Sequence, residues 1–209
     1  MAGDDEQLPL GRLDALSDGV FAIAITLLVL ELALEPDAAD HALRAILDEW
    51  PSYLAYVTSF LTIGVVWIVH STITSQLRAA DATLYRLNLM VLLLVSFLPF
   101  PTKLVGEFLE NEDAERVASV FYGLTLFALV LALTFLIRYA FGRPELLRDH
   151  IGEERASAAM RFRPSYLYYA VAIAVAFVLP ILAVALYLGI ALYLGVPAGT
   201  IRRLVRRPS

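Results

Sequence analysis

The 209-residue chain contains no cysteine, and it has only three histidines. Without cysteine there is no disulfide, no thiolate metal site and no cysteine nucleophile. The motifs H-E-x-x-H and G-x-S-x-G, which mark zinc proteases and serine hydrolases, are also absent. The three histidines, His41, His70 and His150, lie in different segments. The sequence therefore predicts neither an enzyme nor a metal site, and it predicts no cofactor.

Charged residues are scarce, at 18% of the chain, whereas 59% of the residues are hydrophobic and the mean hydropathy is +0.71. A soluble domain is nearer ~45–50% apolar. The apolar residues gather in six blocks, so we expect an all-α membrane protein whose residues 1–209 form one six-helix transmembrane domain. It would be surrounded by the lipid bilayer, with no nucleic acid as a partner. The expected helices cover about 12–34, 50–74, 84–102, 117–138, 164–180 and 181–201.

The last two of these helices come from one stretch, Pro164 to Ile201, that contains no charged residue. As a single helix of 38 residues it would be ~57 Å long, nearly twice the ~30 Å hydrocarbon core of a bilayer. Leu179-Pro180 lies in its middle, and a residue before proline is biased away from helix. We therefore expect two helices joined by a tight turn.

Basic residues are unevenly distributed between the segments that join the blocks. Three of the 16, Arg44, Lys103 and Arg116, fall on one side of the predicted membrane, together with ten acidic residues. The remaining 13 fall on the other side. Because Lys and Arg favour the cytoplasmic side, both termini are expected to be cytoplasmic and the protein to be a multi-pass component of the plasma membrane.

The first block begins with charged residues, in the stretch RLDALSDG from Arg12 to Gly19. Only 12 uncharged residues, Gly19 to Leu30, then precede Glu31. They span ~18 Å, which is too short for a helix that faces lipid alone. We therefore expect the first helix to lie inside protein, where its polar start is not exposed to hydrocarbon.

Six polar or aromatic residues are expected at one depth, at the cytoplasmic ends of the first three helices. They are Arg12, Ser17, Asp18, Trp67, His70 and Asn88. A buried carboxylate needs hydrogen-bond donors, and this set supplies them. We interpret the set as a structural polar clamp that fixes the first helix. A proton relay through Asp18 and His70 is the alternative.

These residues also carry a family resemblance. R-x-x-x-L-S-D at Arg12 to Asp18 resembles the R-x-x-x-F-S-D signature of the transmembrane protein 175 family of potassium channels. W-x-x-H (Trp67 and His70), Asn88 and the P-F-P-T run at 99–102 resemble its bacterial members and occur in the same order. Leu16 stands where the family has phenylalanine, which puts the aromatic packing of the clamp in question.

The resemblance implies a homotetramer in which the first helix is central and lines a cation pore. Gly19, Ile23, Thr26, Leu27 and Leu30 form a helical stripe with one hydroxyl and no charge. By analogy with the family, we assign Ile23 and Leu30 to a hydrophobic constriction and Thr26 to selectivity, with Leu27 as a near neighbour on the pore wall. The permeant ion would be K+, with other monovalent cations discriminated against weakly.

Other features bear on this assignment. Glu31 and Glu35 lie four residues apart at the outer end of the first helix. Rings of acidic side chains at a pore mouth concentrate cations. An ordinary solvated helix end would show the same two residues. No T-V-G-Y-G filter is present. A proton-coupled secondary transporter that uses Asp18 and His70 is one alternative function, and a non-conducting membrane scaffold is another.

Overall fold

The structure is a computed structural model that describes residues 9–32, 42–112, 114–148 and 165–196. Within these ranges the named elements are all helices, and Leu77 and Leu147 form an isolated antiparallel bridge. The helices are α1 (Leu10–Leu27), α2 (Ala42–Asp48), α3 (Trp50–Thr74), α4 (Ala82–Phe97), α5 (Pro99–Phe108), α6 (Glu115–Phe141), α8 (Ser165–Ala176) and α9 (Pro180–Gly195), with 3-10 helices η1 (Leu28–Glu31) and η3 (Pro144–Leu146).

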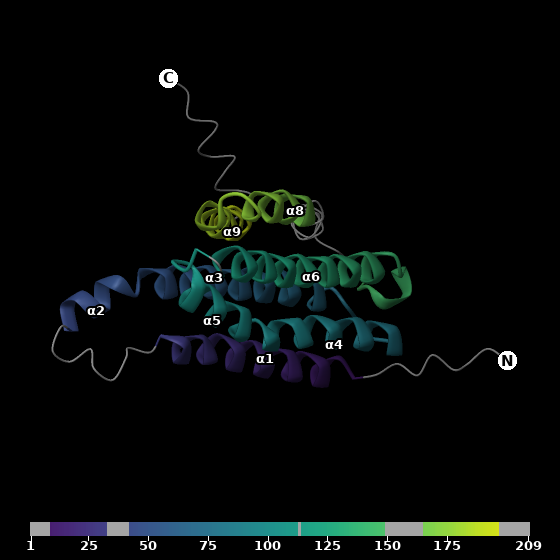
Figure 1. Ribbon diagram of the computed structural model, residues 1–209. Helices are drawn as coiled ribbons and strands as arrows, with labels where there is room; N and C mark the ends of the chain where they lie inside the picture. Colours follow the sequence, from purple (N-terminus) through teal and green to yellow (C-terminus); the bar gives the residue numbers. More distant parts are fainter. Residues whose placement is uncertain (1–8, 33–41, 113, 149–164, 197–209) are drawn as a thin grey trace, which may run out of the picture.

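The long helices lie side by side in layers (Figure 1). Helix α1 forms one outer layer and packs on α3 and α4. Helices α3 and α6 lie in the middle, and α8 and α9 cover them on the side opposite α1. One face of α1 is therefore left uncovered by its own chain.

Four helical spans are long and apolar enough to cross a membrane, judged by length and composition: Leu10–Glu31, Trp50–Thr74, Ala82–Phe108 and Glu115–Phe141. The spans differ widely in how much of their apolar 18-residue segment is buried. The buried share is 28% for Leu10–Glu31 and rises to 61% for Glu115–Phe141. The span with the most polar start is thus the one that the rest of the chain covers least.

The third span is bent at Pro99, which is the first residue of α5. Leu98 separates α4 from α5, and its own backbone angles are helical, so the two helices form one continuous span. A proline inside a helix removes one backbone hydrogen bond and clashes with the preceding turn, which bends the helix there.

Helix α2 lies in a segment that the sequence pattern treats as a connection, because its seven residues are too few to show a clear period.

Buried hydroxyl groups join α3, α5 and α6. Ser59 forms hydrogen bonds with Thr102 at 2.6 Å and with the Tyr122 hydroxyl at 2.8 Å, and all three side chains are buried. Between membrane helices, such bonds add to packing because lipid offers no alternative partner for the hydroxyl. Thr102, the last residue of the P-F-P-T run, therefore connects α5 to the centre of the subunit.

Gly123 of α6 allows Tyr187 of α9 to approach closely. A Cβ atom on Gly123 would contact the Tyr187 hydroxyl and would lie 2.6 Å from its Cζ. Tyr187 is fully buried, with its ring stacked on Tyr169 and edge-on to Tyr122. The tyrosine therefore has little room to move aside.

We expect Gly123→Ala to destabilise the packing of α6 against α8 and α9 by about 1–3 kcal/mol, the usual cost of overpacking. The measurement is the thermal unfolding midpoint of the detergent-purified protein. Gly189→Ala is the matched control, because a Cβ there would meet nothing within 4 Å and alanine favours helix by ~1 kcal/mol. Equal midpoints for the two variants would contradict the assignment of Gly123.

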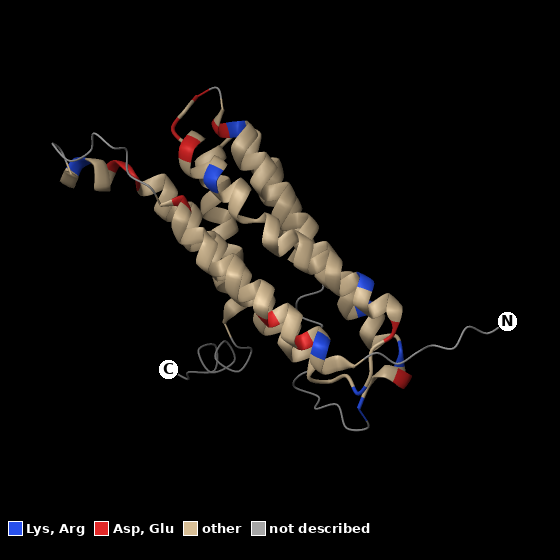
Figure 2. Cartoon of the chain, turned by 90° about the horizontal axis from the view of Figure 1, so that it is seen from below, with Lys and Arg blue, Asp and Glu red and all other residues tan. Residues whose placement is uncertain are grey.

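The two ends of the bundle differ in charge (Figure 2). One end, where α3 ends and α4 begins, has more basic than acidic residues among those described: Arg12, Arg78, Arg86, Arg138, Arg143 and Arg148 against Asp14, Asp18, Asp81 and Glu145. We call it the basic end. The opposite end, which includes α2 and the connection between α5 and α6, has more acidic than basic residues: Asp48, Glu49, Glu107, Glu110, Glu112 and Glu115 against Arg44, Lys103 and Arg116.

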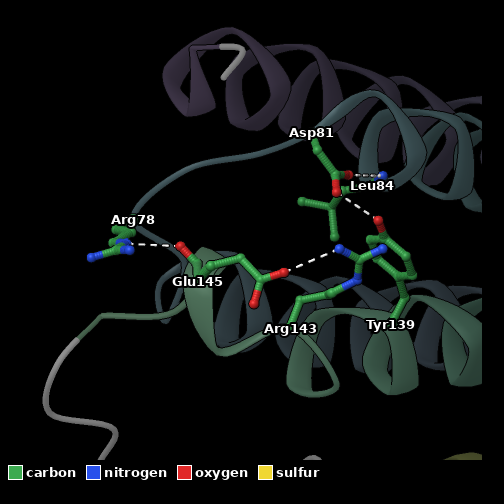
Figure 3. Close-up of polar contacts among 6 residues, drawn as sticks. All are labelled: Arg78, Asp81, Leu84, Tyr139, Arg143 and Glu145. Carbon is green, nitrogen blue, oxygen red and sulfur yellow. Dashed lines mark hydrogen bonds and ion pairs between the residues drawn. The ribbon is translucent and has the colours of Figure 1, made fainter. Parts of the chain in front are cut away.

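Polar contacts at the basic end tie the start of α4 to the end of α6 (Figure 3). Asp81 caps α4 by accepting from the Leu84 backbone N–H at 2.8 Å, and it also accepts from the Tyr139 hydroxyl. Arg78 donates through Nε to the Glu145 carbonyl at 2.8 Å. Exposed Glu145 accepts from Arg143 at 3.0 Å. The start of α4, which carries Asn88 two turns later, is thereby fixed in place.

Candidate functional site

The uncovered face of α1 and η1 carries the stripe predicted from the sequence. Ile23 and Leu30 are 60% and 69% exposed in the single chain, and Leu27 is 40% exposed. Gly19 and Thr26 are exposed as well. All five residues of the stripe therefore point away from the subunit that carries them.

The opposite face of α1 packs against α3 and α4. Its buried residues are Leu13, Ser17, Phe21 and Ala24, followed by Leu28 in η1. Their spacing of three or four residues is that of a single helical face. Ser17, which is fully buried, is the one polar side chain on this face.

Ser17 belongs to a buried hydrogen-bonded group that joins three helices. The amide nitrogen of Asn88 on α4 donates to Ser17 Oγ at 3.0 Å, and Ser17 Oγ donates to the Leu13 carbonyl at 2.8 Å. The Asn88 amide oxygen lies 2.6 Å from Nε2 of His70 on α3. Because an amide oxygen can only accept, His70 Nε2 carries the proton. The Phe21 ring covers the imidazole, with centroids 5.5 Å apart.

Asp18, the neighbour of Ser17, lies outside this buried group. Its Oδ1 accepts from Nε1 of Trp67 at 2.9 Å, and Trp67 is 42% exposed. Ser17 and Asp18 differ by about 100° around the helix, so one turns to Asn88 and the other to Trp67. The predicted polar clamp is thus two separate contacts of α1: Ser17 with Asn88 and His70, and Asp18 with Trp67.

Arg12, the sixth predicted member, is exposed. Within the described part of the chain, no hydrogen bond or ion pair joins its side chain to the other five. The start of α1 is fixed instead by Tyr85 of α4, whose hydroxyl donates to the Pro9 carbonyl at 2.7 Å. Tyr85 was not predicted from the sequence, because a tyrosine in an apolar block gives no sign of a distant partner. Leu16 is exposed and lies apart from the buried group.

We expect Asn88→Ala to lower the thermal unfolding midpoint, because it leaves His70 Nε2 without its acceptor in a buried site. A buried donor left unpaired costs about 1–3 kcal/mol. Ser96→Ala is the control on the same helix, since the exposed Ser96 hydroxyl donates within its own helix to the Leu93 carbonyl. A midpoint for Asn88→Ala no lower than that of Ser96→Ala would show that the group adds nothing to stability.

Of the two acidic residues predicted at the far end of the first helix, the structure describes one. Glu31 ends η1 and is half-buried, whereas Glu35 lies outside the described residues. Among the residues that the structure describes, no three His, Asp or Glu side chains cluster as metal ligands would. The candidate site is therefore the exposed stripe of α1 and η1 together with the contacts that fix its rotation.

Known proteins share both the sequence and the fold. Residues 12–99 match the family described as the endosomal/lysosomal potassium channel TMEM175. A potassium channel from Streptomyces collinus is 39% identical over 173 residues, which cover 80% of this chain and 82% of the relative. A potassium channel from Chamaesiphon minutus is 38% identical over 179 residues, which cover 83% and 87%.

A solved structure extends the match to three dimensions. The crystal structure of a lysosomal potassium-selective channel TMEM175 homolog from Chamaesiphon minutus has a TM-score of 0.78 with this chain and is 35% identical to it. The match covers 88% of this chain and 95% of that one. These similarities confirm the resemblance read from R-x-x-x-L-S-D and the later landmarks. The chain belongs to the TMEM175 family of potassium channels, a family of ion channels and not of enzymes.

Proposed function

We propose that four copies of this chain form a channel for K+ and other monovalent cations, with α1 and η1 of each copy lining a central pore. The observation that carries the proposal is the position of the stripe. Ile23, Leu27 and Leu30 are exposed on the least covered of the four long spans. The named potassium channels among the relatives support K+ as the permeant ion.

The exposed face of α1 is poorly suited to lipid. Arg12 and Asp18 are exposed near its start, and Glu31 follows the stripe. Charged side chains at membrane depth are costly and usually face a protein interior or a water-filled path. Further copies of the chain would cover this face, and four-fold symmetry would bring the four stripes around one axis.

Around such an axis Ile23 and Leu30 would form rings of branched aliphatic side chains, and Leu27 would lie between them. Narrow apolar rings close a pore by dewetting. Thr26 would place a ring of hydroxyls between the aliphatic rings. Its Oγ donates to the Ile23 carbonyl at 2.9 Å and lies 3.1 Å from that of Ala22. With its proton turned to the backbone, each oxygen keeps lone pairs for a partly dehydrated cation.

The contacts of Arg12, Ser17, Asp18, Trp67, His70 and Asn88 would then serve to hold α1 at the rotation that aims the stripe inward. Ser17 and Asp18 engage α4 and α3 from adjacent positions of α1, so rotation of α1 in either direction stretches one of the two contacts. The side chain of Arg12 would bind a neighbouring copy of the chain. The separate hydrogen bonds of Asp18 with Trp67 and of His70 with Asn88 support the clamp interpretation over a proton relay, which would need Asp18 and His70 to share a hydrogen-bonded path.

We assign the membrane arrangement from apolar composition and charge. Helices α8 and α9 have 12 and 16 residues, or ~18 and ~24 Å, which is shorter than the ~30 Å hydrocarbon core. Both lie in the uncharged stretch from Pro164 to Ile201, and we assign them, with uncharged residues that flank them, as the fifth and sixth crossings of a single domain over residues 1–209. The basic end would face the cytoplasm with both termini, in the plasma membrane. Glu31 and Glu35 would then ring the outer mouth of the pore and concentrate cations.

The test is the reversal potential of the purified protein in a planar bilayer under opposed potassium and sodium gradients. The proposal predicts a reversal potential displaced toward the equilibrium potential of potassium. A reversal potential at that of sodium, or the absence of current from intact oligomers, would contradict it and would favour the transporter or the scaffold.

A further inference from the structure

We propose that the outer seam between α8 and α9 is a binding groove for one acyl chain of a membrane phospholipid. The proposal rests on the proposed function in one respect, because the pore axis defines which face of the subunit is outermost. The groove has a volume of about 440 Å³, within the ~300–1,000 Å³ typical of ligand sites. It is lined by Tyr168, Val171, Ala172, Leu186, Gly189, Ile190 and Tyr193.

The groove owes its shape to small residues on both walls. Gly189 faces open space, since a Cβ built there meets no atom within 4 Å. Ala172 lies across from it on α8. On α9 the lining residues recur at intervals of three and four from Leu186 to Tyr193, which is one helical face about 10 Å long. The groove is therefore a slot along the helices and suits a linear, flexible hydrocarbon.

The groove faces away from the rest of the subunit. Tyr169 and Tyr187, about a third of a turn away on the same two helices, are buried against α3 and α6, whereas Tyr168, Val171 and Tyr193 in the groove are exposed. Figure 1 shows the α8–α9 layer on the side of the bundle opposite α1. If α1 lines the axis of a tetramer, this layer is the part of each subunit farthest from the axis. The bilayer then contacts the groove directly.

The chemistry of the groove agrees with an acyl chain as its occupant. No charged residue occurs between Pro164 and Ile201, so the walls offer nothing to a charged ligand. Tyr168 and Tyr193 close the slot near the start of α8 and the end of α9, with their rings edge-on at 6.1 Å. Tyrosine is enriched where hydrocarbon meets the polar head groups of a membrane. The pair marks the end of the slot at which the lipid head group would emerge.

Two other occupants fit less well. Residues 197–209 of the same chain include Arg202, Arg203, Arg206 and Arg207, and the groove has no acidic side chain to balance them. A second tetramer would contact this face with its own α8–α9 layer, so a groove would meet a groove. Helices pack by placing the ridges of one into the grooves of the other, and this contact would lack the ridge.

Retention of a lipid would depend on this shape. Hydrocarbon is as apolar in the bilayer as in the groove, so there is no hydrophobic gain on binding and only van der Waals packing holds the chain. Filling the slot with a protein side chain should therefore remove the lipid without disturbing the helices. Gly189→Leu does this, because its position is open.

The experiment is native mass spectrometry of the full chain, expressed in bacteria, whose membranes supply phospholipid, and purified in mild detergent. It compares the wild type, Gly189→Leu and Ala185→Leu. Ala185 is exposed on α9 and does not line the groove, so its leucine variant is the matched control. We expect the wild type and Ala185→Leu to retain phospholipid on each subunit, and Gly189→Leu to lose most of it.

Equal retention by all three proteins would overturn the proposal, because the lipid would then be a general coat. Absence of retained lipid from the wild type would overturn it as well. The same spectra report the mass of the assembly, which tests the tetramer separately. A lipid lost on Gly189→Leu from an assembly that is not a tetramer would support the groove and contradict the proposed pore.

Discussion

Replacing Ile23 with asparagine is expected to raise the resting potassium current of the purified protein in a planar bilayer. Ile23 is 60% exposed on the pore-facing stripe, and a ring of asparagines holds water where a ring of isoleucines excludes it. Removing a barrier of about 1.4 kcal/mol raises a rate about tenfold, so we expect an increase of at least that order. The measurement is the single-channel current and open probability in symmetric potassium.

The control is Val178→Asn, which introduces the same side chain at a residue that is 74% exposed beyond the end of α8. It should leave the current unchanged, because the residue is far from α1. Leu30→Asn should behave like Ile23→Asn if both residues form the constriction. Unchanged currents in both stripe variants, from oligomers of normal size, would place the constriction elsewhere.

Replacing Asp18 with alanine is expected to disrupt assembly or gating. It removes the acceptor for Trp67 Nε1, which is 2.9 Å from Asp18 Oδ1. A hydrogen bond to a charged group contributes about 1.5–3 kcal/mol. The partial exposure of Trp67 reduces the value in a single chain, and four copies would multiply it. The measurements are the oligomeric state in detergent and the bilayer current.

Two variants separate the hydrogen bond from other effects of this substitution. Asp18→Asn keeps an oxygen that accepts from Trp67 and should preserve most of the assembly. Asp14→Ala removes a half-buried carboxylate one turn earlier, and it should have a smaller effect. An Asp18→Ala variant that assembles and conducts like the wild type would contradict the clamp.

The sequence predicted best those features that depend on local periodicity. Ile23, Thr26 and Leu30 share a face because a helix repeats every 3.6 residues, and the structure exposes all three. The polar start of the first helix and its short uncharged run predicted a membrane helix that needs protein partners. The family resemblance and the all-helical membrane class are confirmed. Packing of one copy against another stays a proposal, because the period of one helix does not say what covers its face.

Long-range contacts were predicted less well. Trp67 and His70, three residues apart on α3, were expected to serve one cluster, yet they bond Asp18 and Asn88 separately. A small rotation of α3 decides between these outcomes, and it is set by the packing of the whole bundle. The bridge between Leu77 and Leu147 likewise joins segments 70 residues apart, and no local sequence pattern predicts it.

The central claim is that the exposed stripe of α1 lines the pore, and the absence of cysteine from the chain permits a direct measurement. We would record bilayer potassium currents from Thr26→Cys and Val178→Cys before and after adding a thiol-reactive reagent. The account predicts that the current through Thr26→Cys is blocked, whereas the wild type and Val178→Cys are unaffected. A Thr26→Cys channel that is fully labelled and still conducts normally would contradict it.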